Sequence, residues 1–247
     1  MSKRNISLRD AKILWGKSGS KCAISKKNLI QEKKEGNNYI IGEVAHIEGE
    51  KPGSARYNPN MTDVDRNSYE NLILLSPNSH TIIDNNPEEY TVDKLKQIKT
   101  NHEEWVESSL KTHMPNVTFA ELEVIVKYLV ATPILGSDDS MTLIPPKEKI
   151  ERNNLSTEVE NLITTGMLQV KQVKKYLNTH LDIQFAERLK VGFVNKYKKF
   201  RKEGLEGDAL FYALLDFSSN NSSDFKIMAA GLSVLTYYFE LCEVFEK

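Results

Sequence analysis

Four polar side chains, His46, Asn71, His80 and Asp84, lie at the ends of two hydrophobic runs or just beyond them. His80 and Asp84 are four residues apart, so a helix through them carries both on one face. An imidazole nitrogen and a carboxylate oxygen placed in this way can bind one divalent metal ion together. His46 can then take a proton from a water molecule that attacks a phosphodiester. These residue types and spacings therefore predict metal-assisted hydrolysis of phosphodiester bonds.

The segments around these side chains predict two strands and a helix. The run NNYIIGEVAHI (37–47) is rich in β-prone residues and bounded by polar ones, which indicates a strand that ends near His46. NLILL (71–75) has the length and composition of a buried strand. A helix is expected from Ser79 to about Asp84, where NNP stops it. This ββα order brings the polar side chains together.

Other segments connect and flank this arrangement. Residues 48–69 are rich in Gly, Pro, Asn and Asp and show no periodicity, so we expect a long loop there. Residues 91–111 have apolar side chains at helical spacing, which predicts an amphipathic helix. His102 lies on the apolar face of that helix, and for this reason we expect a structural role for it.

Several segments resemble, in the same order, those of the HNH (ββα-metal) endonucleases: CAIS, EVAHI, PGSAR, DRNSYENLILL, SPNSHTIID, NPEEYTVDKL and KTNHEEWV. The resemblance covers roughly residues 10–108. It implies that His46 is the general base and that Asn71 hydrogen-bonds the loop between the two strands and so orients the base. His80 and Asp84 would hold the metal ion, Mg²⁺ or Mn²⁺, and Arg56 would hold the scissile phosphate of DNA.

The sequence departs from the family at two places. Many relatives have an acidic metal ligand directly before the base, where this chain has Ala45. Glu43 is a possible replacement only if the strand is bulged, because an unbroken strand places it on the opposite face from His46. Whether Glu43 joins the metal ligands stays open.

A structural zinc ion is common among HNH proteins and is held by two pairs of cysteines. The matching positions here are Cys22, Ser25, Ser76 and Ser79. Because a serine hydroxyl is a poor zinc ligand beside a thiolate, we expect no structural zinc, and packing and hydrogen bonds in its place.

Beyond MPN (114–116), helical periodicity dominates. We therefore expect an α+β protein with an HNH nuclease domain at 1–113 and an all-α domain at 114–247. A loop is expected at 131–149, and an apolar helix is expected to run to the last residue. That helix must pack either within its own bundle or on a partner.

Several C-terminal segments resemble the helical domains of effector enzymes in ABC three-component conflict systems. They are FAERLKVGFVNKYKKF, EGLEGDALFYALLDF and YYFELCEVFEK. The resemblance implies docking on an SMC/ABC-type ATPase and a middle component, in defence against phage or plasmids.

Composition fits this interpretation. No apolar run approaches the roughly 18 residues of a membrane span, and no secretory leader follows the basic N-terminus, so we expect a cytoplasmic protein without a membrane segment. Ten Lys/Arg against three Asp/Glu in residues 1–40 suit phosphate contacts or form a solvated basic face.

Two alternatives to the DNA endonuclease remain. One is a catalytically weak or inactive HNH-derived module that binds nucleic acid. The other, which has less support, is a C-terminal domain that senses a nucleotide messenger.

Overall fold

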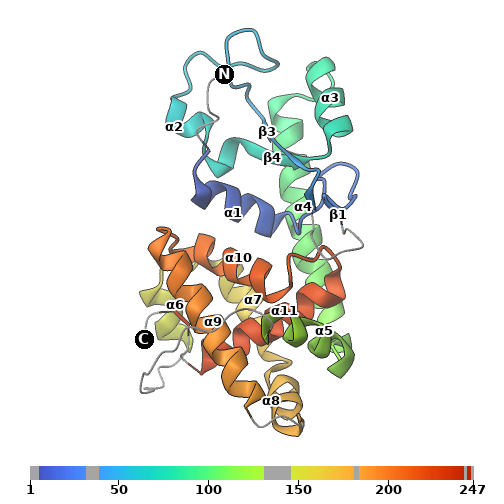
Figure 1. Ribbon diagram of the computed structural model, residues 1–247. Coiled ribbons are helices and arrows are strands. Elements are labelled where there is room, and N and C mark those ends of the chain that lie inside the picture. The colour runs from blue at the N-terminus through green and yellow to red at the C-terminus, as the bar shows by residue number, and fades with distance from the viewer. Residues whose placement is uncertain (1–5, 32–38, 131–145, 181–183, 242–243, 246–247) are drawn as a thin grey trace. The chain divides into compact units, whose positions relative to one another are not determined.

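The computed structural model describes residues 6–31, 39–130, 146–180, 184–241 and 244–245. The chain divides into two compact units, Met1–Ser108 (unit 1) and Ser109–Lys247 (unit 2). Figure 1 shows the strands in the N-terminal, blue to green part of the chain, and helices elsewhere.

Unit 1 combines short strands with helices. Its elements are α1 (Leu8–Lys17), β1 (Ile30–Gln31), β2 (Tyr39–Ile40), β3 (Glu43–His46), α2 (Asp63–Arg66), the 3-10 helix η1 (Tyr69–Asn71), β4 (Leu72–Leu75), α3 (Pro77–Asn85) and α4 (Val92–His113), and α4 continues into unit 2. β1 pairs antiparallel with β2, and β3 pairs antiparallel with β4. The order β3, β4, α3 is therefore strand, strand, helix (Figure 1).

β4 lies in the middle of the core of unit 1. All four of its side chains are fully buried, which agrees with its continuous apolar sequence. Residues from the neighbouring elements complete this core, among them Leu14 of α1, Ala45 of β3, Ile83 of α3 and Leu95 of α4. Because β4 is packed on both faces, it holds its paired strand β3 and the helix that follows it, α3, in fixed positions.

The expected strand over 37–47 is interrupted. Residues 37–38 lie outside the described residues, and the remainder forms β2 and β3 with a break at Gly42. A Cβ atom at Gly42 would lie 2.9 Å from the ring of Trp15 and 3.0 Å from Leu29. The absence of a Cβ at Gly42 therefore lets the backbone approach the indole closely.

Helix α3 begins two residues before the expected start at Ser79. Ser76 is its N-cap, and the Ser76 hydroxyl accepts a hydrogen bond from the backbone N–H of Ser79. Pro77 then occupies the first helical position, where a missing N–H has no cost. The proline in SPN thus starts the helix rather than delaying it.

The expected long loop at 48–69 contains α2 and the start of η1, and a buried arginine braces it. Arg66 is 3% exposed, and its guanidinium donates to the backbone carbonyls of Gly49, Asn58 and Met61. These bonds satisfy loop carbonyl groups that regular secondary structure would otherwise satisfy.

Unit 2 is all-α within the described residues, as expected. Its elements are the 3-10 helix η2 (Met114–Asn116), α5 (Phe119–Val130), α6 (Pro146–Arg152), α7 (Thr157–Met167), α8 (Val170–Thr179), α9 (Phe185–Lys202), α10 (Gly207–Ser218) and α11 (Phe225–Glu240). Residues 131–145 of the expected loop lie outside the described residues. The rest of that segment belongs to α6, so the loop prediction was wrong there.

Helix α11 is the central helix of unit 2. It packs against α5, α7, α8 and α10, and most of its apolar side chains are buried. Two glycines let α11 lie close to α7 and to the end of α10. A Cβ at Gly166 of α7 would lie 2.2 Å from the Thr236 hydroxyl, and one at Gly231 of α11 would lie 2.8 Å from the Ser219 backbone. The helix ends at Glu240 instead of running to the last residue. Among the described residues, none of the helices has the length and apolar character to cross a membrane.

Candidate active site

The pairing of β3 with β4 decides which side chains reach α3. Glu43 lies opposite Leu75, and His46 lies opposite Leu72. Because side chains alternate along a strand, Glu43 and His46 project from opposite faces of β3. Helix α3 starts directly after β4, so the Leu75 end of the strand pair, with Glu43, lies beside its first turn.

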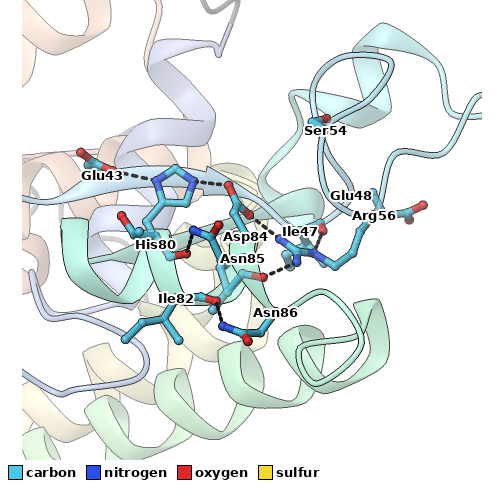
Figure 2. Close-up of polar contacts among 12 residues, drawn as sticks. Glu43, Ile47, Glu48, Ser54, Arg56, His80, Ile82, Asp84, Asn85 and Asn86 are labelled. Atoms are coloured by element: carbon cyan, nitrogen blue, oxygen red, sulfur yellow. Dashed lines mark hydrogen bonds and ion pairs between the residues drawn. The ribbon is translucent and has the colours of Figure 1, made fainter.

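His80 and Asp84 meet on one face of α3, as their spacing predicts. His80 Nε2 lies 3.3 Å from Asp84 Oδ2. The other ring nitrogen, Nδ1, lies 2.7 Å from Glu43 Oε2. Figure 2 shows these contacts as a continuous series from Glu43 through His80 to Asp84. The Asp84 side chain is 46% exposed and that of His80 is 22% exposed, so solvent reaches the pair.

The separation between these two atoms fits a shared divalent ion. Ligand atoms that lie about 2.1 Å from one ion at roughly right angles are about 3 Å apart. The described residues contain no group of three or more His, Cys, Asp or Glu side chains that could hold a metal ion. His80 and Asp84 would therefore supply two ligands, and water and phosphate oxygens would supply the others.

Arg56 is engaged by the protein itself. Its Nε donates to the carbonyl of Ile47, Nη1 donates to the carbonyl of Ile83, and Nη2 bonds Asp84 Oδ1 at 2.7 Å (Figure 2). The side chain is only 4% exposed. Its backbone lies in the left-handed region, with φ of 57°, which a residue with a side chain rarely adopts. The guanidinium expected to hold a phosphate is thus buried against its own chain, where it orients Asp84.

His46 has a different hydrogen-bond partner from the His80 and Asp84 pair. Its Nε2 is 3.2 Å from Asn67 Oδ1, and within the described part of the chain no hydrogen bond joins it to His80 or Asp84. The link between the two groups is indirect, because Arg56 bonds the carbonyl of Ile47, the residue after His46. The expected base and the expected ligands therefore belong to neighbouring elements connected by one guanidinium.

Asn71 makes the contact expected of it. Its side chain accepts from the backbone N–H of Glu48 and donates to the carbonyls of Glu48 and Arg66. The residue is 3% exposed, so these bonds are shielded from water. They fix the first turn of the loop directly after β3, next to His46. The catalytic role of Asn71 stays a prediction.

The four positions considered for zinc also come together. Cys22 Sγ lies 3.4 Å from both Ser79 Oγ and the backbone N of Ser25, and Ser76 Oγ lies 3.0 Å from Ser79 Oγ. Burial raises the pKa of the Cys22 thiol, but hydrogen bonds from Ser25 and Ser79 outweigh this and lower the pKa to about 7. The cluster joins the segment after α1 to the start of α3.

Comparison with known proteins bears on the C-terminal half. The family model of C-terminal domain 10 of the ABC-three component (ABC-3C) systems matches residues 120–246, just over half of the chain. The chain belongs to this ABC-3C family. The resemblance noted for the C-terminal helices is thereby confirmed, and a search of the curated proteins found no match.

All candidate site residues of this ABC-3C chain precede the matched region. The match therefore identifies unit 2, while the site rests on its own geometry. Three site contacts were missed from the sequence: Glu43 with His80, Asn67 with His46, and Arg66 with the loop. All three residues fall within the quoted segments. Glu43 and Asn67 were missed because they lie 37 and 21 residues from their partners, and Arg66 because it bonds backbone carbonyls, which carry no sequence signal.

Proposed function

We propose that this ABC-3C protein is a divalent-metal-dependent endonuclease that hydrolyses phosphodiester bonds of DNA. The observation that carries the proposal is the approach of His80 Nε2 to Asp84 Oδ2 on α3. This helix directly follows β4, whose antiparallel partner β3 ends in His46. The strand, strand, helix order supports the HNH assignment of unit 1, and so does the contact of Asn71 with the loop backbone.

His80 and Asp84 are the residues that would hold the ion. A bound Mg²⁺ or Mn²⁺ would stabilise negative charge on the phosphodiester oxygens. Asp84 is oriented by Arg56, whose buried guanidinium fixes Oδ1 and leaves Oδ2 on the side of His80. For this reason we assign Arg56 a positioning role in place of phosphate binding.

His46 is the proposed general base. The Oδ1 atom of Asn67 is an acceptor, so Nε2 of His46 carries the hydrogen in this contact. The lone pair of the neutral ring then lies on Nδ1, which can take a proton from a water molecule. Asn71 holds the loop that begins beside His46 and so limits its movement.

Unit 2 supports a role within a larger assembly. Its match to an ABC-3C C-terminal domain favours docking of the chain on the other components of such a system, an SMC/ABC-type ATPase and a middle component. In this proposal the chain is the effector in defence against phage or plasmids, and its partners restrain the nuclease until DNA is sensed.

A second candidate function is a module that binds nucleic acid without cutting it. It is favoured by the small set of two metal ligands and by the three serines at the zinc positions. This alternative predicts DNA binding under every metal condition and cleavage under none.

A plasmid assay separates the two candidates. Supercoiled DNA is incubated with the protein and Mg²⁺ or Mn²⁺, with and without the proteins encoded beside it. We expect nicked or linear product. His46→Ala should slow cleavage by about 10²- to 10⁴-fold and keep Mn²⁺ binding, whereas His80→Ala should lose both. Absence of cleavage by the wild-type protein in every mixture would overturn the nuclease proposal, and cleavage by His46→Ala at the wild-type rate would remove the base assignment.

A further inference from the structure

We propose that Glu43 is a positioning residue that fixes the tautomer of His80 and so turns the lone pair of Nε2 toward Asp84. The inference rests on the proposed function in one respect, that Nε2 of His80 is the nitrogen that binds metal. The sequence left open whether Glu43 is itself a metal ligand. In this proposal Glu43 hydrogen-bonds the ligand His80 and does not contact the metal ion.

The donor and acceptor capacities of the three groups decide which ring nitrogen of His80 carries the hydrogen. An ionised carboxylate only accepts hydrogen bonds, so in its 2.7 Å contact with Glu43 Oε2 the Nδ1 atom of His80 must carry a hydrogen. A neutral imidazole has one N–H, and Nε2 is then left with its lone pair. A carboxylate bonded to the rear nitrogen of a ligating histidine also raises the basicity of the ring.

Nε2 and Asp84 Oδ2 are then two acceptors that face each other at 3.3 Å. Two lone pairs at this distance repel each other unless a positive charge lies between them. Arg56 does not supply that charge, because its Nη2 bonds the other oxygen of Asp84. With Nδ1 bonded to Glu43, a metal ion bound to Nε2 would supply this charge, and a second proton on Nε2 would also supply it. The measurement of the ring protonation described below distinguishes the two.

The register of the strands explains why Glu43 reaches His80. Glu43 opposes Leu75, the last residue of β4, and Ser76 then caps α3. His80 lies one turn into that helix, so its ring comes beside the beginning of β3. No bulge is present in the β3–β4 pairing, whose partners run without interruption from Glu43 with Leu75 to His46 with Leu72.

The tautomer can be measured without any activity. Long-range ¹H–¹⁵N spectra of metal-free protein labelled with ¹⁵N-histidine, recorded at pH 8.5, should show His80 protonated on Nδ1. In Glu43→Ala the hydrogen should move to Nε2, where it donates to Asp84. In Glu43→Gln the side-chain carbonyl still accepts from Nδ1, so the tautomer should be retained. Glu88→Ala, an exposed acid of the same unit, is the matched control.

Titration calorimetry with MnCl₂ gives the second readout. Glu43→Ala should weaken Mn²⁺ binding by about 10- to 100-fold, Glu43→Gln by less, and Glu88→Ala not at all. Should Glu43→Ala fail to fold, Glu43→Gln still decides the question, because a neutral amide must weaken binding relative to the carboxylate.

An Nε2-protonated His80 in the wild-type protein, or wild-type Mn²⁺ affinity in both Glu43 variants, would overturn the inference. Failure of the wild-type protein to cut DNA would refute the nuclease proposal and would leave these two measurements unaffected. The two proposals can therefore fail separately.

Discussion

His102 lies fully buried in unit 1 between a backbone carbonyl and an ammonium group. Its Nε2 is 3.1 Å from the carbonyl oxygen of Ser18, and its Nδ1 is 2.8 Å from Lys26 Nζ. The ring also stacks on Trp105, with centroids 5.5 Å apart. Burial, and after it the charge of Lys26, lower the pKa of His102 to about 4. The histidine is thus a neutral structural group, in agreement with its place on the apolar face of α4.

Unit 1 should therefore lose stability in mild acid. The ordinary pKa of histidine is 6.5, so in the unfolded chain His102 is protonated below this pH. In the folded chain His102 is protonated only below about pH 4. The stabilisation is fully present above pH 6.5 and is lost as the pH falls toward 4. We expect the free energy of unfolding to drop by roughly 3 kcal/mol across this range.

Urea unfolding followed by tryptophan fluorescence measures this change in unit 1 alone, because Trp15 and Trp105 are the chain's two tryptophans. The control is His102→Gln, which removes the titrating ring and should flatten the pH dependence. An equally steep dependence in this variant would assign the effect to other groups.

At the scale of elements, the segment after α1 and the start of α3 bring four side-chain positions together: Cys22, Ser25, Ser76 and Ser79. In a tetrahedral site of four thiolates each sulfur lies about 2.3 Å from zinc, so the sulfur atoms are about 3.8 Å apart. The observed separations of 3.4 Å between Cys22 Sγ and Ser79 Oγ, and 3.0 Å between the Ser76 and Ser79 hydroxyls, are close to this spacing.

Conversion of all three serines to cysteine should therefore create a zinc site. We expect the variant Ser25→Cys/Ser76→Cys/Ser79→Cys to bind one Zn²⁺ per chain and to melt at a higher temperature with zinc than without it. Metal analysis after gel filtration and thermal melts with a chelator measure both effects, with the wild-type protein as the reference. A variant that folds and retains no zinc would show that the four positions do not converge as described.

Elements defined by local pattern were predictable, and contacts made through the backbone were not. The run NLILL gives β4, and the helical periodicity beyond MPN gives the helices of unit 2. The four-residue spacing gave the approach of His80 to Asp84. The phosphate contact expected of Arg56 came from the resemblance of PGSAR to the HNH family. Its bonds to the carbonyls of Ile47 and Ile83 were not foreseen, because every residue carries such an acceptor. Sequence alone cannot distinguish such acceptors.

At the scale of the whole molecule, the chain divides into two compact units. Leu235 of α11 is fully buried, so an aspartate there would place an unpaired charge in the core of unit 2. We expect Leu235→Asp to unfold unit 2, with loss of helical circular dichroism and of binding to the other ABC-3C components.

Unit 1 should remain folded in this variant, with unchanged tryptophan fluorescence and, under the proposed function, unchanged Mn²⁺ affinity. Val124→Asp is the matched control, because Val124 of α5 is 52% exposed and its replacement should leave the circular dichroism spectrum unaltered. Concurrent loss of the fluorescence signal in Leu235→Asp would mean that unit 1 depends on unit 2 for its folding.

Arg56 joins the end of β3 to the end of α3 through the carbonyls of Ile47 and Ile83. A fluctuation that lifts the last turn of α3 must break these bonds or carry the strand end along with it. The backbone segments that carry His46 and Asp84 are therefore expected to move together in one cooperative opening event. Amide hydrogens on both sides of Arg56 should then exchange with deuterium at a common rate.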